Sequence, residues 1–239
     1  MAFCGERAGG GMVYALFMNA VVLALVLQAG VVPTSEYGKT TIEGFTVMIH
    51  PNLEADSGLR DRMVVMLKVE LRKIHELVPA PAFKKIQTTK IWLDKDSKSC
   101  VAAAYHPSAV WLKDHGFNVD MAEGVELGNA KNVLDWSKLN QPFMVLHELA
   151  HSYHHRFLGY DNRDILAAYD AAKKNGKYED VLKKPSGHGR HYGLNNEMEF
   201  FAETTESYFG MNDFQPFNRV ELKTFDPVSY AMVRKAWGD

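Results

Sequence analysis

The chain of 239 residues is poor in cysteine and has almost no net charge. It contains two cysteines, Cys4 and Cys100, and its formal net charge is −2. Two cysteines are too few for a disulfide framework, and Cys100 is left alone if a segment carrying Cys4 is removed. The basic residues are dispersed, and no stripe of them indicates a nucleic-acid-binding surface. We therefore expect no nucleic-acid partner and treat Cys100 as a packed thiol.

The sequence also lacks internal repeats, low-complexity tracts and a linker rich in Gly, Ser or Pro. Hydrophobic residues make up 46% of the chain and charged residues 23%, which is an ordinary globular composition. Because no linker separates the two halves, we expect residues 33–239 to form one domain with two lobes.

Residues 12–32 form the one long apolar run without a charge, and Arg7 precedes it. A small residue, Ala29, stands at a suitable cleavage point, and a polar stretch starts after it. This pattern is typical of a secretory signal peptide. The run is also long enough to span a bilayer, so a membrane anchor is the alternative, followed by a buried core helix. We expect a secreted or extracytoplasmic protein that is membrane-bound only if residues 12–32 are retained.

The first half of the chain reads as strands around one helix. Period-3.6 apolar spacing predicts a helix over 59–77 with an N-cap at Asp56 or Ser57, and Pro79 and Pro81 should end it. Runs rich in β-branched, aromatic or apolar residues predict strands; they cover 40–49 (as one strand or a hairpin), 86–93, 101–105, 109–112 and 124–130. The second half reads as helices over 141–158, 164–173, 178–182, 194–209 and 228–237. The fold class is therefore α+β.

The most informative motif is His147-Glu148-Leu149-Ala150-His151. Positions i and i+4 of a helix share one face, so His147 and His151 can hold one metal ion between them. Glu148 lies beside them and can accept a proton from a water molecule. This is the H-E-x-x-H arrangement of zinc hydrolases. The alternative, a helix with ordinary surface residues, is disfavoured by the apolar residues on both flanks of the motif.

A catalytic zinc needs a third protein ligand. A metzincin-type completion requires Gly and His three and six residues after His151, but His154 and Phe157 occupy those positions. A carboxylate from a second helix is the other possibility. Glu199, Glu203 and Glu206 follow i, i+4, i+7 spacing and share one helix face. Three carboxylates on one face repel one another unless a cation or donors offset them, although a solvated acidic face remains an alternative.

The two motifs together resemble the catalytic domain of anthrax lethal factor and its gluzincin relatives, which include the Pro-Pro endopeptidases. The residues that carry the resemblance are His147-Glu148-x-x-His151 and Tyr192-Gly193-x-x-Asn196-Glu197-x-Glu199-Phe200-Phe201-Ala202-Glu203. The resemblance covers the two motif helices and the loop before the second one.

The resemblance implies a zincin-like fold with a zinc cleft between a sheet-bearing lobe and a helical lobe. It implies Zn²⁺ bound by His147, His151 and Glu199, with Glu148 as general base. Tyr192 would donate a hydrogen bond to the developing oxyanion. On this basis we expect an exported zinc metallopeptidase that hydrolyses peptide bonds in a peptide or protein substrate. The alternatives are an inactive zinc-stabilised binding protein and a zinc amidase acting on non-peptide amides.

Several further residues are candidates for supporting roles. Glu203, one turn after Glu199, is expected to accept a hydrogen bond from a ligand histidine. The end of the 124–130 segment, Asn129-Ala130, is similar to the end of the edge strand with which gluzincins pair a peptide backbone. His154 and His155 are expected to be packing or surface residues rather than a second metal site. The Gly-rich stretch 186–192 is either a mobile flap carrying Tyr192, with Arg190 or His191 touching substrate, or a plain loop.

Overall fold

The structure is a computed structural model that describes residues 30–98, 100–139 and 141–239. Residues 12–29 of the predicted signal peptide or anchor, and Cys4, lie outside these ranges. Within the described ranges, no helix is both long and apolar enough to cross a membrane. Residues 31–239 group into one unit, which holds all the elements described below.

A mixed five-stranded sheet occupies the N-terminal part, in the order β1-β2-β3-β5-β4. The strands are β1 (Gly38–Ile42), β2 (Phe45–Ile49), β3 (Ile91–Leu93), β4 (Ala103–His106) and β5 (Gly124–Leu127). The segment predicted as a strand or hairpin is a hairpin, because Glu43 and Gly44 both have positive φ angles and form a two-residue turn. β2, β3 and β5 are parallel, and β4 is an antiparallel edge strand.

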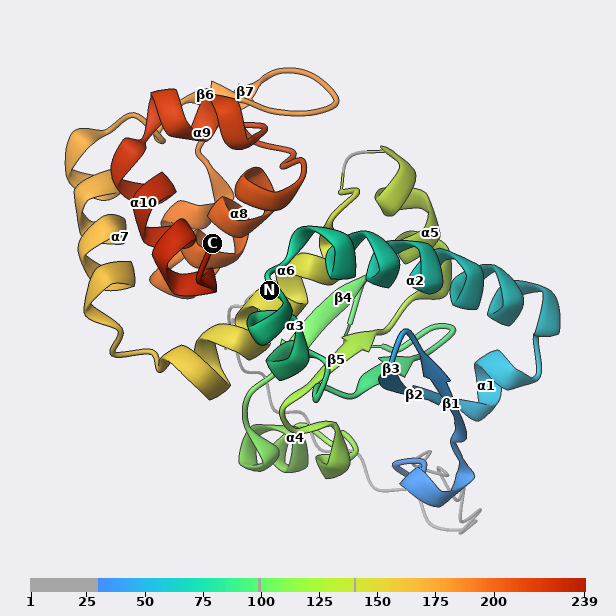
Figure 1. The fold of residues 1–239 in the computed structure, drawn as a ribbon. Helices are drawn as coiled ribbons and strands as arrows, with labels where there is room; N and C mark the ends of the chain where they lie inside the picture. Colours follow the sequence, from blue (N-terminus) through green and yellow to red (C-terminus); the bar gives the residue numbers. More distant parts are fainter. Residues whose placement is uncertain (1–29, 99, 140) are drawn as a thin grey trace, which may run out of the picture. The chain divides into compact units, whose positions relative to one another are not determined.

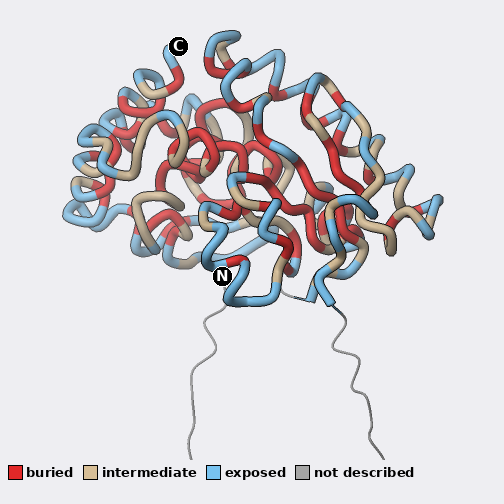
Figure 2. The backbone as a smooth tube through the Cα atoms, turned by 90° about the horizontal axis from the view of Figure 1, so that it is seen from below, coloured by how far each residue is buried: buried red, intermediate tan, exposed pale blue. Residues whose placement is uncertain are grey.

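Alternation along the strands gives the sheet two buried faces. Ile49, Leu93 and Leu127 point to the main core beneath helices α2 (Ser57–Leu77) and α6 (Met144–Tyr153). Met48 and Trp92 point to a smaller cluster beneath helix α4 (Ala109–Asp114). Figure 1 shows α2 and α4 on opposite sides of the sheet, and Figure 2 shows the buried residues gathered in the interior. Apolar residues on both faces of the strands therefore hold the sheet between its helices.

The helices of the N-terminal part are α1 (Pro51–Glu54), α2 (Ser57–Leu77), α3 (Ala80–Ile86), α4 (Ala109–Asp114) and α5 (Ala130–Leu139), with the 3₁₀ turns η1 (Thr34–Glu36) and η2 (Val119–Met121). The predicted helix α2 is confirmed, and the Asp56 carboxylate accepts a hydrogen bond from the N–H of Leu59 at its start. The prolines after α2 end it as expected, but Pro81 also lies in the first turn of α3, where proline fits a helix.

The C-terminal part is mainly helical. Its elements are α6 (Met144–Tyr153), the π-helical turn η3 (His154–Leu158), α7 (Arg163–Asn175), the short strands β6 (Val181–Leu182) and β7 (His188–Gly189), the 3₁₀ turn η4 (Tyr192–Asn195), α8 (Glu197–Phe209), α9 (Arg219–Phe225) and α10 (Pro227–Trp237). The predicted helices over 141–158, 164–173, 194–209 and 228–237 are confirmed to within a few residues. In Figure 1 the helices α7 to α10 lie together, next to α6.

One strand prediction and one helix prediction are wrong, and two strand predictions are too long. Residues 109–112 form helix α4, because the Ser108 hydroxyl caps the N–H of Trp111 and a run of four apolar residues fits a helix as well as a strand. Residues 86–90 belong to the end of α3 and its turn, so only 91–93 are a strand. Residues 178–182 are not helical: α7 ends at the left-handed Gly176, and 181–182 pair with 188–189. Ala130 begins α5 rather than continuing β5.

A test of the fold uses the close approach of β5 to the start of β4. A Cβ added to Gly128 would overlap the Cys100 Cβ and lie 2.9 Å from the Cys100 carbonyl oxygen, and backbone cannot swing aside. Gly128→Ala should therefore lower the free energy of unfolding by about 1–3 kcal/mol. Gly58→Ala is the control, because the added methyl in α2 meets no atom within 4 Å. Urea denaturation of both variants tests this, and equal midpoints would contradict the account.

Candidate metal centre

Helix α6 presents His147 and His151 toward α8, and Glu148 follows His147 directly in the chain. Its apolar residues Leu146, Leu149 and Ala150 are fully buried and hold the helix in the core. The opposite side of the helix carries the two imidazoles, whose ring centroids are 4.8 Å apart. The hydrophobic periodicity of α6 therefore determines which way its polar residues point.

Helix α8 supplies the third group. The Asn196 side chain accepts a hydrogen bond from the N–H of Glu199 and fixes the start of the helix. One oxygen of Glu199, Oε2, lies 3.1 Å from His147 Nε2 and 3.3 Å from His151 Nε2. His147, His151 and Glu199 thus form a group that could hold a metal ion, with their ligand atoms all within 4.8 Å of one another.

The geometry of this group fits zinc. Tetrahedral zinc with bonds to nitrogen and oxygen places its ligand atoms about 3.3 Å apart, close to the two distances from Glu199. Two imidazoles and one carboxylate are also a donor set of catalytic zinc sites. The three side chains are 12–16% exposed, so the group is shielded without being sealed from solvent.

Glu206 accepts a hydrogen bond from the second ring nitrogen of His147. His147 Nδ1 lies 2.6 Å from Glu206 Oε1 and 3.6 Å from Glu203 Oε1, so its N–H donates to Glu206 rather than to the predicted Glu203. This bond leaves Nε2 directed toward Glu199. Glu203 accepts a hydrogen bond from the Asn212 amide. Both carboxylates share the face of α8 with Glu199, and the i, i+7 spacing marked Glu206 as a member of that face.

Burial and mutual repulsion determine the charge state of these groups. Burial raises the pKa of Glu203 and of Glu206, and the negative charge of Glu206 raises the pKa of Glu203 further. Burial opposes ionisation of Glu199, but hydrogen bonds from His147 and His151 outweigh it and lower its pKa well below the usual range. Burial likewise opposes charge on His147, yet its bonds to Glu199 and Glu206 raise its pKa. The carboxylates therefore favour positive charge between α6 and α8.

Glu148 and Tyr192 complete the set of predicted reactive groups. Glu148 is 8% exposed and follows the ligand His147 directly. Tyr192 begins η4, which packs on α8. Burial and the negative charge of Glu199 raise the pKa of Tyr192 to about 12, so its hydroxyl keeps its proton near neutral pH and can donate it.

The stretch before Tyr192 is held by internal hydrogen bonds. His191 is 1% exposed and accepts a hydrogen bond from the N–H of Gly193, so it caps η4 and does not face a substrate. Arg190 donates to the Leu194 carbonyl and to the Asn195 side chain. Residues 190–195 thus form a hydrogen-bonded turn that holds Tyr192, and only the hairpin before it extends outward.

The predicted substrate strand is wrong. Asn129 and Ala130 follow β5, which is paired with β3 on one side and β4 on the other, so neither residue belongs to an edge. Asn129 caps the N–H of Asn132, and Ala130 is buried at the start of α5. β1 and β4 are the edge strands of the sheet, and β4 is the one next to β5. This order could not be predicted from the sequence, because β4 precedes β5 in the chain but lies outside it in the sheet.

The other candidate residues have structural contacts. Cys100 is buried, and burial raises the pKa of its thiol, as expected of a packed cysteine. His154 is fully buried against Phe201 and Tyr160, and His155 bonds the Tyr105 hydroxyl. Among the described residues, neither histidine belongs to a group that could hold a metal ion.

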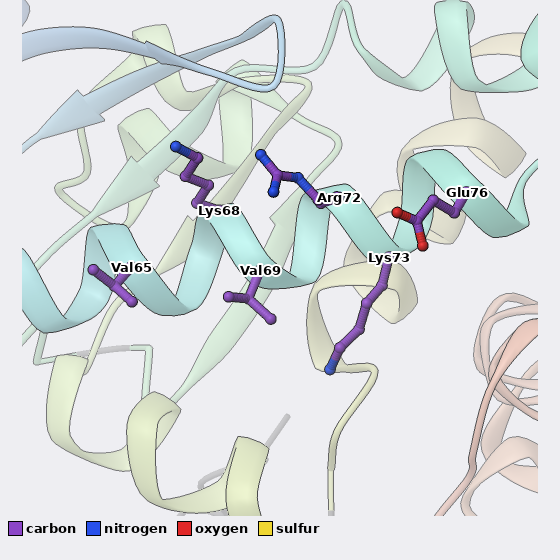
Figure 3. Close-up of a pocket in the computed structure, with 6 residues that line it drawn as sticks. All are labelled: Val65, Lys68, Val69, Arg72, Lys73 and Glu76. Atoms are coloured by element: carbon purple, nitrogen blue, oxygen red, sulfur yellow. The ribbon is translucent and has the colours of Figure 1, made fainter.

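A separate surface hollow of about 240 Å³ lies on the exposed side of α2 (Figure 3). Its lining consists of Val65, Lys68, Val69, Arg72, Lys73 and Glu76. None of these residues belongs to the metal-binding group on α6 and α8.

Comparisons of the chain with protein-family models, with curated proteins and with solved structures find no match. The residues between α6 and α8 are therefore the evidence for a function.

Replacing Glu206, which accepts the hydrogen bond from His147, tests the metal centre. Glu206→Gln keeps the size of the side chain but removes its charge, and zinc affinity should fall about 10-fold to 100-fold because His147 loses its orienting carboxylate. Competition with a chromogenic chelator measures this affinity. Glu76→Gln, an exposed change on α2, is the matched control and should bind zinc as the parent does. Unchanged affinity in Glu206→Gln would refute the role of this hydrogen bond.

Proposed function

We propose that this protein is an exported zinc metallopeptidase of gluzincin type with a zincin-like fold. The observation that carries the proposal is the convergence of Glu199 from α8 on His147 and His151 from α6, with Glu148 in the adjoining position. The resemblance of both motifs to the gluzincins supports the same assignment. The apolar segment 12–32 supports export, and retention of that segment would make the enzyme membrane-bound.

The residues of the chain have separate tasks in this reaction. His147, His151 and Glu199 would hold zinc, which when bound acidifies water and polarises a carbonyl oxygen. Glu148 accepts the proton of the attacking water and returns it to the leaving amine. Tyr192 donates a hydrogen bond to the carbonyl oxygen as negative charge develops there. Glu206 holds the His147 ring in the tautomer that this arrangement needs.

The edge strand β4 supports a peptide as the substrate. The N–H of Gly128 donates a hydrogen bond to the Ala102 carbonyl. In an antiparallel pair only every second residue bonds the neighbouring strand. The backbone N–H and C=O groups of Ala103 and Tyr105 therefore point away from β5, toward the outer edge of the sheet. An extended peptide can pair with such groups in register. β4 packs on α6, which carries the motif. This free edge favours a peptidase over an amidase for non-peptide substrates.

The choice between an active peptidase and an inactive zinc-binding protein depends on Glu148 and Tyr192. Metal retention needs neither residue, because three other side chains provide the ligands. Catalysis explains why Glu148 and Tyr192 lie beside the ligand group. A protein that only binds zinc would need neither residue. The proposal therefore favours the active enzyme.

Glu148→Gln separates the chemistry from metal binding. The variant should bind about one zinc ion per chain, like the parent, because its ligands are intact. Its hydrolysis rate should fall by about 10²-fold to 10⁴-fold, since the amide cannot accept the proton of water. Mass spectrometry of a random peptide library incubated with each zinc-loaded protein measures both rates. Equal cleavage by variant and parent would show that Glu148 is not the base.

Tyr192→Phe tests the oxyanion donor. Loss of one such donor should lower kcat by about 10²-fold to 10³-fold and leave KM nearly unchanged, because the bond forms in the transition state. Steady-state kinetics on the best peptide from the library provide both constants. Tyr230→Phe removes a hydroxyl from α10 instead and should have parental kinetics. A rise in KM at constant kcat would assign Tyr192 to substrate binding.

A further inference from the structure

The π-helical turn η3 follows the motif helix directly and changes the direction of its side chains. π-turns of this kind occur often at functional sites. His155 lies one turn after the ligand His151, and its Nδ1 is 2.8 Å from the Tyr105 hydroxyl of the edge strand β4. The turn therefore connects the metal-binding helix to the strand that can pair with a peptide.

Tyr160 folds back over this turn. Gly159, at φ 80°, reverses the chain, and its N–H donates to the His154 carbonyl. The Tyr160 ring then stacks on the His155 ring, with centroids 5.0 Å apart and planes at 26°. Both rings are partly exposed. Tyr105, His155 and Tyr160 thus form a continuous row of rings that begins at the edge strand.

A carboxylate accompanies these rings. Glu197 and Phe201 are one turn apart on the same face of α8, and Phe201 contacts His154 beneath Tyr160. Glu197 is partly exposed, and among the described residues no Lys or Arg forms an ion pair with it. Burial raises the pKa of Tyr160, and the negative charges of Glu197 and Glu199 raise it further, to about 12. The effect of Glu197 agrees with its position near the Tyr160 ring. The nearby Arg156 is engaged by Glu123, Thr88 and Thr89.

We infer that His155, Tyr160 and Glu197 form a subsite that selects a basic side chain of the substrate. Stacked rings beside an unpaired carboxylate attract a lysine or arginine side chain through cation–π contact and charge. The position fits, because His155 follows the ligand His151 by one turn and contacts Tyr105 of β4. A peptide paired with β4 passes Tyr105 next to this row. The inference rests on the proposed peptidase function and adds its specificity.

Profiling with one random decapeptide library tests the subsite in two ways. The zinc-loaded parent is assayed by cleavage, and zinc-loaded Glu148→Gln is assayed by affinity selection, which needs no hydrolysis. In both assays Lys or Arg should be enriched about tenfold at one position relative to norleucine. Glu197→Gln should remove most of this enrichment, and Glu197→Lys should reverse it in favour of Asp and Glu. Tyr160→Phe should keep it, whereas Tyr160→Leu should weaken it.

The two assays distinguish the failure of each claim. Cleavage with no basic preference, or with a preference that Glu197→Gln leaves intact, overturns the subsite and leaves the peptidase standing. Selection of basic peptides without any cleavage by the parent overturns the peptidase and supports the subsite. Neither cleavage nor selection overturns both. Glu76→Gln serves as the control and should keep the parental preference, and circular dichroism with zinc titration checks that each variant is folded and loaded.

Discussion

The structure depends on the acidic side chains that α8 buries against α6. Glu203 and Glu206 are each 4% exposed, and Glu199 lies on the same helix face. Burying carboxylates together is costly unless positive charge or donors offset them. His147 lies between them and uses both ring nitrogens, one toward Glu199 and one toward Glu206. A cation held by His147, His151 and Glu199 would complete this compensation, which explains why acidic residues occupy the interior of an otherwise apolar helix pair.

The rest of the fold holds these two helices in place. The parallel strands β2, β3 and β5 form a buried platform for α6, and β4 leaves an unpaired edge beside it. Asn196 caps α8, and His191 caps the turn that carries Tyr192. Each reactive side chain is therefore attached to a regular element or a capped turn, which favours a preorganised site.

How well each helix or strand could be predicted depends on the length of its segment and on the spacing of its apolar residues. Long amphipathic helices such as α2, α6, α8 and α10 were predictable, because many apolar positions report the same period. The motif spacing placed His147 and His151 on one helix face, and the resemblance to the gluzincins singled out Glu199 among three glutamates; the structure brings these three residues together. The predictions for short segments were wrong, because residues 109–112 and 178–182 each fit more than one secondary structure. Capping by Ser108 makes 109–112 a helix, and pairing with 188–189 makes 181–182 a strand. The acceptor of His147 and the order of β4 and β5 depend on tertiary packing, so neither was readable from local sequence.

The central claim is that one metal ion is bound by His147, His151 and Glu199. Anomalous diffraction at the zinc edge, from crystals grown with one equivalent of zinc, tests it most directly. We expect a single peak bonded to Nε2 of both histidines and to a Glu199 oxygen, at about 2.0–2.2 Å. The structure also contains a competing group, formed by His147 with Glu203 and Glu206. A peak bonded to His147 Nδ1 and those two carboxylates, or no peak between α6 and α8, would contradict the account.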